Sequence, residues 1–355
     1  MRSATFDLVA ELPLTVEELT LEGRHRPVTS GFVRRTTIVH LRGGRQEGLG
    51  EDVTYSEENQ LAFQRATFDV AGETTLAGFS ARVGELDLFP DDEPGDPAFR
   101  LYRSWAFESA ALDLALRQAR RSLAEVLGRD PRPVTFVVSL RLPEPPTTEP
   151  VRRLLELYPT LRLKLDATSS WNEALVQELV DLGAVDSIDL KGAYRGTVVD
   201  QPPDPELYER VTRAFPRAWI EDPAVTPATE PILRPHRDRM TWDAPIHSVG
   251  DIEALPFPPR MLNVKPSRFG SVEALFEAYD HCAERGIGMY GGGQFELGPG
   301  RGQIQLLAAL FHPDGPNDVA PSAYNEGELR PGLPESPLEA DPAPTGFRRR
   351  EPGNT

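Results

Sequence analysis

The sequence predicts an α/β protein in two parts, an α+β segment over residues 1–130 followed by a region of alternating strands and helices. Its length of 355 residues is more than one domain usually holds. Hydrophobic residues make up 39% of the chain, which is typical of a folded protein with a substantial core. From Val134 onward, short apolar runs recur every 22 to 32 residues with helical patterns between them. That spacing indicates a parallel sheet built from βα units.

The first part combines strands with one long helix. The β-branched run Phe32–Leu41 predicts a strand, and Gly43–Gly44 predicts the turn that closes it. A second strand begins near Gly48. The apolar spacing over Arg103–Leu127 predicts a helix, for which Gly128 provides the C-terminal stop.

The second part is a repeat of apolar runs with charged residues at their ends. Seven runs form the repeat: Thr135–Leu142, Leu161–Leu165, Ser187–Leu190, Ala218–Ile220, Met240–Trp242, Met261–Val264 and Ile287–Tyr290. Five charged residues stand where such runs end: Lys164, Asp189, Glu221, Asp243 and Lys265. Charged groups at the carboxyl ends of strands are typical of the active-site face of a (β/α)8 barrel. An open doubly wound sheet also bears charges there, so the spacing alone leaves both architectures open.

The composition limits the classes of partner. Lys and Arg total 38 against 55 Asp and Glu, a formal net charge of −17. This charge repels nucleic-acid phosphates and anionic lipids, so we expect no nucleic-acid and no membrane partner. The single cysteine, Cys282, rules out an intrachain disulfide and indicates a reducing compartment. Because no signal-peptide pattern and no long apolar stretch is present, we expect a cytoplasmic protein.

The three carboxylates among these charged residues predict a metal site. Asp189, Glu221 and Asp243 would offer only oxygen ligands, which suit Mg²⁺ and allow Mn²⁺ as a substitute. Zinc would require His or Cys ligands, and the six histidines form no close pair.

The order and spacing of these residues resemble the enolase superfamily, in particular the subgroup with muconate-lactonizing enzyme, o-succinylbenzoate synthase and the dipeptide epimerases. Arg162–Lys164 is similar to the Lys-x-Lys motif of the second barrel strand, with the first lysine replaced by arginine. Asp189 in SIDLKGAY, Glu221 in WIEDP and Lys265 in LNVKPSRFG fall where the next motifs lie. Gly48–Glu51 is similar to a turn in the capping domain of this family.

The resemblance implies a (β/α)7–8 TIM-like barrel with an α+β N-terminal capping domain. The barrel with its metal site would occupy residues 131–327. The capping domain would occupy residues 1–130 and be completed by about 328–347. We expect residues 348–355 to be a disordered tail.

The resemblance also implies the roles of the residues. Lys164 and Lys265 would be the catalytic bases, and Asp189, Glu221 and Asp243 would hold Mg²⁺. Further residues are expected to bind substrate: Asn263, Glu296, Gly292, Gly293, Lys191, Asp166, Thr29 and Ser30. Such a site implies removal of the α-proton of a small carboxylate substrate through an ene-diolate, as in a racemase, epimerase or cycloisomerase.

Two other functions remain open. Two lysines on opposite faces of a substrate suit racemisation, but they also suit syn elimination, so a dehydratase similar to o-succinylbenzoate synthase is an alternative. A barrel that keeps the metal site without catalysis is a second alternative. The resemblance does not decide the substrate or the oligomeric state, and a homo-oligomer is compatible with it.

Three segments allow two interpretations. The run LKLDATSSW around Asp166 also resembles the third-strand motif of the family, and with that alignment Asp166 would be a metal ligand and Asp243 would not. We favour the first alignment, because the second leaves too few strands before the ligand to carry a lysine. Lys191 is either an extra cation beside the metal or half of a structural ion pair. The glycine-rich run Gly298–Gly302 offers N–H groups that can hold an anion, or it forms turns without a ligand.

Overall fold

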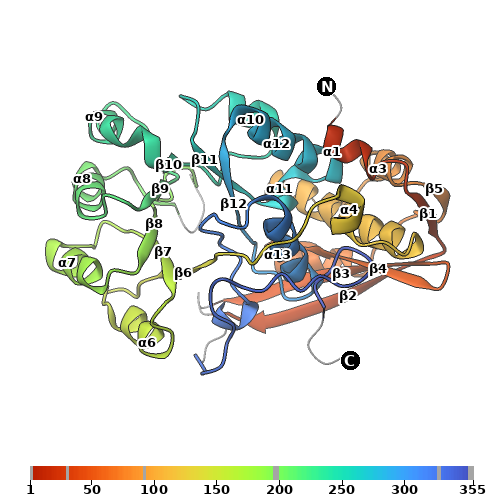
Figure 1. Cartoon of the computed structure of the whole chain (residues 1–355), viewed down its shortest axis with the longest axis horizontal. Helices are drawn as coiled ribbons and strands as arrows, with labels where there is room; N and C mark the ends of the chain where they lie inside the picture. The colour runs from red at the N-terminus through yellow and green to blue at the C-terminus, as the bar shows by residue number, and fades with distance from the viewer. Residues whose placement is uncertain (1–2, 29–31, 91–92, 195–199, 326–328, 351–355) are drawn as a thin grey trace.

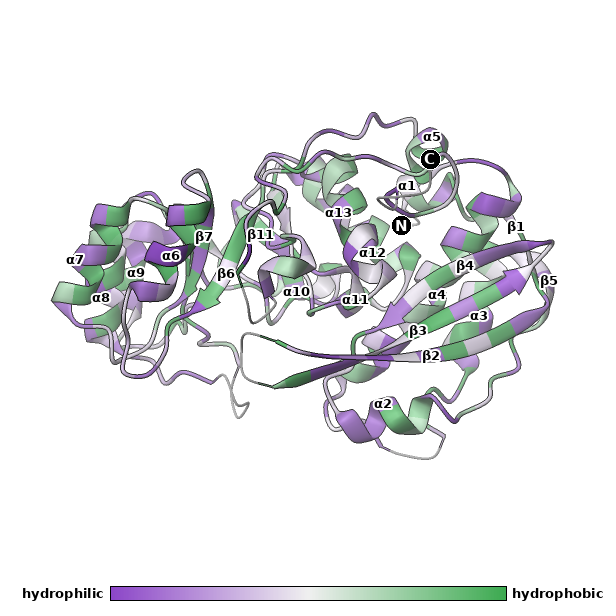
Figure 2. Cartoon of the chain, turned by 90° about the horizontal axis from the view of Figure 1, so that it is seen from below, coloured by the Kyte–Doolittle hydropathy of each residue, from purple (hydrophilic) through white to green (hydrophobic). Residues whose placement is uncertain are grey.

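The computed structural model describes residues 3–28, 32–90, 93–194, 200–325 and 329–350, which form an antiparallel α+β part and a parallel barrel beside it (Figure 1). The α+β part contains α1 (Ala4–Asp7), β1 (Pro13–Val16), β2 (Glu18–Pro27), β3 (Val33–Gly43), β4 (Gln46–Asp52), α2 (Glu57–Phe63), β5 (Gly72–Thr75), α3 (Leu76–Glu85), α4 (Ala98–Gln118) and α5 (Leu123–Leu127). The sheet of β2, β3 and β4 extends toward the barrel (Figure 2). Among the described residues, no helix combines the length and apolar character that a membrane span requires.

The helix predicted over Arg103–Leu127 is in fact two helices, α4 and α5. The chain leaves α4 at Arg120, whose φ of 56° lies in the left-handed region. Ser122 then caps α5 by accepting a hydrogen bond from the backbone N of Glu125 at 3.2 Å. Gly128, with a φ of 61°, ends α5 as predicted.

Two glycines allow α4 to lie directly on β4. A Cβ at Gly48 would lie 2.2 Å from the carbonyl oxygen of Ala110, and one at Gly50 would lie 1.9 Å from that of Ala106. Any side chain at these two positions would push the helix off the sheet. The run Gly48–Glu51, which the resemblance likened to a turn, lies within strand β4, and close packing requires its glycines there.

The second part is a closed barrel, as the family resemblance implied. Its strands are β6 (Val137–Arg141), β7 (Arg162–Asp166), β8 (Val185–Asp189), β9 (Trp219–Glu221), β10 (Met240–Thr241), β11 (Met261–Val264) and β12 (Gly288–Gly291). The strands from β6 to β10 pair in parallel in chain order, and β11 pairs with β12. The backbone N of Asn263 donates to the oxygen of Trp242 at 3.0 Å and joins β11 to the end of β10.

Residues 317–318 take the eighth place in the ring. The N of Val137 donates to the oxygen of Asn317 at 2.9 Å, and the N of Asp318 donates to the oxygen of Gly291 at 2.8 Å. These two bonds connect β12 back to β6, so the open-sheet alternative is wrong. The other described elements of this part are α6 (Glu149–Leu157), α7 (Glu173–Leu182), α8 (Pro205–Ala214), α9 (Glu230–Leu233), η1 (Arg234–Arg239), α10 (Val249–Glu253), α11 (Pro266–Phe269), α12 (Val272–Arg285), α13 (Pro299–Phe311) and η2 (Ser322–Asn325).

The chain after the barrel returns to the α+β part. The backbone N of Leu338 first donates to Val134 O, just before β6, at 2.8 Å. The N of Leu123 on α5 then donates to Gly346 O at 3.1 Å, and the ring of Phe347 packs edge-on against that of Trp105 on α4, with ring centres 6.5 Å apart. Arg348 pairs with the buried carboxylate of Asp113 on α4. Our expectation of a disordered tail is therefore wrong for residues 348–350, because this ion pair and the buried ring beside it hold them. Residues 351–355 lie outside the described part of the chain.

The side chain of Glu51, at the end of β4, joins the α+β part to the barrel. Its carboxylate accepts hydrogen bonds from the backbone N of Leu297 at 2.6 Å, of Gly298 at 3.0 Å and of Gly300 at 3.0 Å. These groups lie at the start of α13, which has no side-chain cap of its own. The glycine-rich run was predicted as an anion site or as plain turns, and the anion that it holds is this carboxylate.

Replacing Glu51 by Ala should free the start of α13 without unfolding the barrel. We expect hydrogen exchange at the amides of Leu297, Gly298 and Gly300 to become at least about tenfold faster, since one lost buried hydrogen bond contributes roughly 1.5 kcal/mol or more when the acceptor is charged. Mass spectrometry of exchanged peptides measures this. Glu47→Ala, on the same strand but partly exposed, is the control and should leave these amides unchanged. Equal exchange in both variants would contradict the assignment.

The buried carboxyl group of Glu108 should make the stability of the fold depend on pH. This carboxyl lies on α4, buried, and accepts a hydrogen bond from the N of Val272 at the start of α12 at 3.2 Å. Burial raises the pKa of Glu108 to about 7 from an ordinary value of 4.5. A raised pKa means that the folded protein holds the proton more tightly, so Glu108 lowers the stability as the pH rises from about 4.5 to 7.

Glu108→Gln should remove this loss. We expect the variant to match the wild type at pH 5 and to exceed its free energy of unfolding by up to about 3 kcal/mol at pH 8. Urea unfolding at the two pH values measures the difference. Glu284→Gln, on the exposed side of α12, should show no such change. A Glu108→Gln difference that is the same at both pH values would show that this carboxyl does not titrate between them.

Candidate active site

The five charged residues predicted at strand ends come together at the carboxyl end of the barrel. Lys164 lies on β7, Asp189 ends β8 and Glu221 ends β9, while Asp243 and Lys265 follow β10 and β11. All five are at most 7% exposed. Asp166 on β7 pairs with Asp189 on β8 in the sheet, so the two strands end at the same level.

Lys164 is the centre of one group of charges. Its Nζ lies 3.1 Å from Asp189 Oδ2, pairs with Glu221 Oε1, and lies 3.5 Å from Asp318 Oδ2. The hydroxyl of Tyr290 donates to the other oxygen of Glu221. The sequence reasoning missed Asp318, because the eighth place of the barrel has no apolar run that would mark it.

A donor set for a divalent cation lies in this group. One carboxylate oxygen each of Asp189, Glu221 and Asp222 lie within 4.8 Å of one another, and all three residues are buried. Buried carboxylates without enough cations are unstable, so this set fits a hard cation such as Mg²⁺. Asp222 was not predicted, although it directly follows Glu221 in the WIEDP motif.

Asp222 also connects the ends of two strands. Its two carboxylate oxygens accept hydrogen bonds from the N of Asp243 at 2.8 Å and the N of Ala244 at 2.9 Å. Its φ of 46° is unusual for a residue with a side chain. The strained backbone turns this carboxylate toward the end of β10.

Asp243 is surrounded by donors instead of by the other predicted ligands. Its Oδ2 accepts from Lys265 Nζ at 2.8 Å and from the hydroxyl of Tyr194 at 2.8 Å, and its Oδ1 accepts from Arg268 Nη1 at 2.8 Å. Arg268 follows Lys265 by three residues on α11 and was not predicted. The structure thus groups Asp189 and Glu221 with Asp222, and metal ligation by Asp243 stays a prediction.

The pKa values of the two predicted bases are shifted in opposite directions. Burial alone would lower the pKa of Lys164, but the carboxylates of Glu221 and Asp189 outweigh it and hold this pKa well above the ordinary value. Burial lowers the pKa of Lys265; Asp243 opposes this effect, and the positive charge of Arg268 reinforces it. The two amines therefore stand in opposite electrostatic environments.

Lys191 contacts both carboxylates at the ends of β7 and β8. Its Nζ pairs with Asp189 Oδ2 and lies 3.5 Å from Asp166 Oδ1, and it lies 4.9 Å from the centre of the Tyr194 ring. Asp166 thus faces an ammonium group and is outside the three-carboxylate set. Its alternative role as a metal ligand stays a prediction.

The loop after β12 forms a wall beside Lys265. A Cβ at Gly292 would lie 2.6 Å from Lys265 Cε and 2.6 Å from Asn263 Oδ1. Both polar side-chain atoms of Asn263 are buried and have no hydrogen-bond partner in the described part of the chain. A polar substrate group could satisfy them.

Other predicted substrate residues lie elsewhere. Glu296 pairs with Arg301 at 2.9 Å and accepts from the N of Gln294 at 2.6 Å, so its carboxylate is already engaged. A Cβ at Gly293 would lie 2.6 Å from Glu296 Oε2, which places this glycine against the same carboxylate. Thr29 and Ser30 lie outside the described residues.

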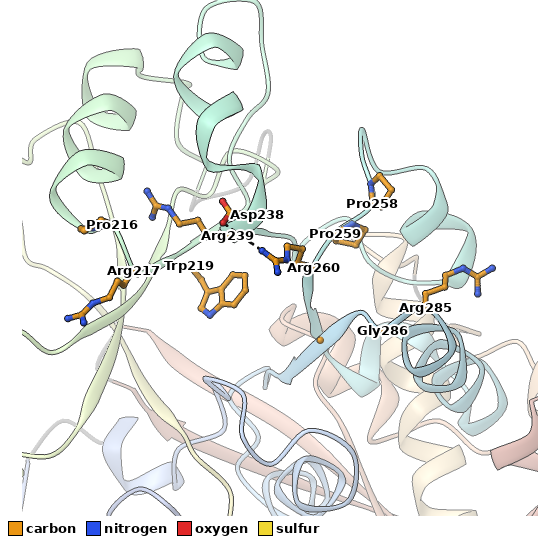
Figure 3. Close-up of a pocket in the computed structure, with 11 residues that line it drawn as sticks. Pro216, Arg217, Trp219, Asp238, Arg239, Pro258, Pro259, Arg260, Arg285 and Gly286 are labelled. Carbon is orange, nitrogen blue, oxygen red and sulfur yellow. Dashed lines mark ion pairs between the residues drawn. The ribbon is translucent and has the colours of Figure 1, made fainter.

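A hollow of about 810 Å³ lies at the opposite end of the barrel and holds none of these residues (Figure 3). Trp219 and Gly288, which begin β9 and β12, line it, so it lies at the amino ends of the strands. Its arginines do not converge, because the guanidinium groups of Arg217 and Arg285 point outward. Nothing in it forms a competing active site.

Known proteins with similar sequences are o-succinylbenzoate synthases. The enzyme of Geobacillus stearothermophilus is 27% identical over 231 residues, which are 62% of this chain and 59% of that protein. The enzyme of Geobacillus kaustophilus is 26% identical over the same shares of the two chains. This chain therefore matches less than two thirds of the length of these relatives.

Solved structures of enolase-superfamily proteins share the fold. The dipeptide epimerase from Methylococcus capsulatus, solved with a Mg ion, has a TM-score of 0.63 and 19% identity over 95% of this chain and 92% of its own. A member from Listeria innocua has a TM-score of 0.64 and 18% identity over 89% and 88%. Muconate-lactonizing enzyme from Pseudomonas putida has a TM-score of 0.59 and 18% identity over 86% and 88%. The predicted enolase-superfamily fold, a capping domain on a barrel, is confirmed.

Two family models also match the chain. The N-terminal domain of the family described as "Domain of unknown function (DUF8230)" matches residues 7–126, and its C-terminal domain matches residues 130–326. The second match alone covers more than half of the sequence. The chain therefore belongs to the DUF8230 family.

Proposed function

We propose that this chain is a Mg²⁺-dependent enzyme that removes the α-proton of a small carboxylate substrate, as an isomerase or a lyase. The observation that carries the proposal is that two buried lysines, Lys164 and Lys265, each pair with a buried carboxylate at the carboxyl end of the barrel. Lysine is a base that the enolase-superfamily chemistry uses for this step. The names of the similar proteins, which include synthases, a cycloisomerase and an epimerase, support the same class of reaction.

The carboxylates would hold the metal. Asp189 and Glu221 would be ligands, with Asp222 or Asp243 as the third. When bound, Mg²⁺ supplies positive charge that stabilises the negative charge developing on the substrate carboxylate. The chain itself buries all four of these carboxylates.

The two lysines would have different roles in proton transfer. The environment of Lys265 lowers its pKa, so Lys265 gives up its proton more readily than Lys164 and can then accept the α-proton as an amine. The environment of Lys164 favours its ammonium form, which can stabilise a developing anion or return a proton. This asymmetry favours a reaction in which one lysine is the base and the other a charge, so a syn elimination or a cycloisomerisation is a specific second candidate beside racemisation.

Glu221→Gln should abolish metal binding while the fold stays intact. A ligand at the mouth of the barrel contributes to the site more than to the core, so we expect Mg²⁺ affinity to fall by about 100-fold or more. Calorimetric titration with Mg²⁺ measures the affinity, and circular dichroism checks the fold. Glu230→Gln, at the exposed start of α9, is the control. Unchanged Mg²⁺ affinity in Glu221→Gln would show that Glu221 is not a ligand of the metal.

The same titration identifies the third ligand. Asp222→Asn and Asp243→Asn should differ in Mg²⁺ affinity. The variant that no longer binds Mg²⁺ identifies the third ligand. Asp166→Asn should keep it if the alignment that we favour is right. Loss of Mg²⁺ in Asp166→Asn alone would instead support the second alignment.

The lysines separate the two reaction types. In a two-base racemase, each of Lys164→Ala and Lys265→Ala should stop racemisation but still exchange the α-proton of one enantiomer with solvent. In a one-base elimination, only Lys265→Ala should stop proton exchange, by about 100-fold or more, because general-base catalysis contributes that much. Deuterium incorporation followed by NMR on both enantiomers measures this. Wild-type protein that binds Mg²⁺ but exchanges no α-proton across a broad carboxylate panel would favour the non-catalytic barrel.

A further inference from the structure

The distribution of lysine in this chain is uneven. Only three of the 38 basic residues are lysines, Lys164, Lys191 and Lys265, and all the others are arginines. Each of the three lies at the carboxyl end of the barrel with its Nζ against a buried carboxylate. Everywhere else the chain uses arginine for a positive charge. The proposed function assigns a task to two of these lysines and leaves the third without one.

The backbone presents Lys191 in a fixed and unusual conformation. Its φ is 52°, in the left-handed region that a residue with a side chain rarely adopts. Its N donates to Asp189 Oδ1 at 3.1 Å, and the N of Gly192 donates to the oxygen of Asp222 at 2.9 Å. These two bonds hold the start of the loop after β8, so the side chain is aimed at the site by its own backbone.

Among the described residues of the site, the carboxylates outnumber the cations that pair with them. Six carboxylates gather there: Asp166, Asp189, Glu221, Asp222, Asp243 and Asp318. Four cations oppose them: Lys164, Lys191, Lys265 and Arg268. The formal balance of these ten described groups is two negative charges, which a divalent cation would bring to zero. Without Lys191 the site with its metal would stay negative and would repel an anionic substrate.

We propose that Lys191 is a third functional lysine, whose compact ammonium balances Asp166 and Asp189 so that the site with its divalent cation accepts an anionic substrate. A guanidinium is a wide planar fork, whereas an ammonium is a compact charge that fits between two carboxylates of neighbouring strands. Lys191 therefore acts on substrate affinity through the charge of the site. This inference rests on the proposed Mg²⁺ site.

The test compares two affinities in the full-length protein, that for Mg²⁺ and that for oxalate in saturating Mg²⁺. Lys191→Met should bind Mg²⁺ at least as tightly as the wild type, because a nearby positive charge is gone. The same variant should bind oxalate about tenfold more weakly or worse, because the site has become negative. Isothermal calorimetry measures both. Arg237→Met removes an exposed cation on η1 and should change neither affinity.

Chemical rescue separates charge from packing. Lys191→Cys, alkylated with bromoethylamine, regains an ammonium group of nearly the length of lysine, and it should bind oxalate within about threefold of the wild type. The buried Cys282 of the wild-type protein controls for the reagent. Because affinity is measured before and after alkylation of one preparation, a folding defect in Lys191→Met does not decide the outcome.

The outcomes distinguish the two proposals. Wild-type protein that binds Mg²⁺, with oxalate affinity unchanged in Lys191→Met, would overturn the role of Lys191 and leave the proposed function intact. Alkylation that restores nothing would do the same. Wild-type protein that does not bind Mg²⁺ would overturn the proposed metal site, and the charge balance that depends on it.

Discussion

Buried charge is the constraint on which the arrangement of this barrel depends. Asp189, Glu221 and Asp243 are fully shielded from solvent, and an unpaired carboxylate in such a place costs several kcal/mol. The chain meets this cost with cations from other strands, Lys164 against the first two and Lys265 against the third. Because each ion pair joins different strands, displacement of one strand leaves a buried charge alone. Closure of the ring and pairing of the buried charges therefore support each other.

The α+β part contributes to the site through the loop after β12. Gln294 in this loop accepts hydrogen bonds from Arg34 and from the hydroxyl of Tyr55, and it donates to the hydroxyl of Tyr102, each at 3.0 Å. Glu51 holds the end of the same loop at α13. The wall that packs against the predicted base is thus positioned largely by residues far away in the sequence. A barrel without its cap would keep its strand-end charges but lose the shape beside them.

The strands of the barrel could be predicted because buried parallel strands are continuous apolar runs. Every run placed from Val134 onward is a strand, within about three residues at either end. The eighth place at residues 317–318 could not be predicted, since two bridging residues produce no run. The split between α4 and α5 also escaped, because the left-handed turn at Arg120 carries no glycine or proline to mark it. Sequence patterns therefore identified the long elements and missed the turns and bridges that depend on single residues.

The residues of the candidate site also divide into those that the sequence pattern predicted and those that it missed. The strand-end charges could be identified because charged residues recur at a regular spacing, and that spacing can be read from the sequence without any knowledge of contacts. Asp222, Arg268 and Asp318 could not be identified, because their importance comes from neighbours in space, Asp243 after β10 and Lys164 on β7. A carboxylate that bonds to the backbone of the next strand looks, in the sequence, like any other carboxylate.

The contacts of Asp243 connect the third ligand to the predicted base. A carboxylate oxygen accepts two hydrogen bonds, and Oδ2 of Asp243 already accepts one from Lys265 and one from Tyr194. Ligation of a metal through this oxygen and the ion pair with Lys265 therefore exclude each other. Asp222, whose oxygens each accept a single backbone hydrogen bond, keeps room for a ligand without such a change. Ligation through Oδ1 of Asp243, which among the described residues accepts only from Arg268, would keep the ion pair, whereas ligation through Oδ2 would release Lys265. The ligand atom therefore decides whether the predicted base is released or held.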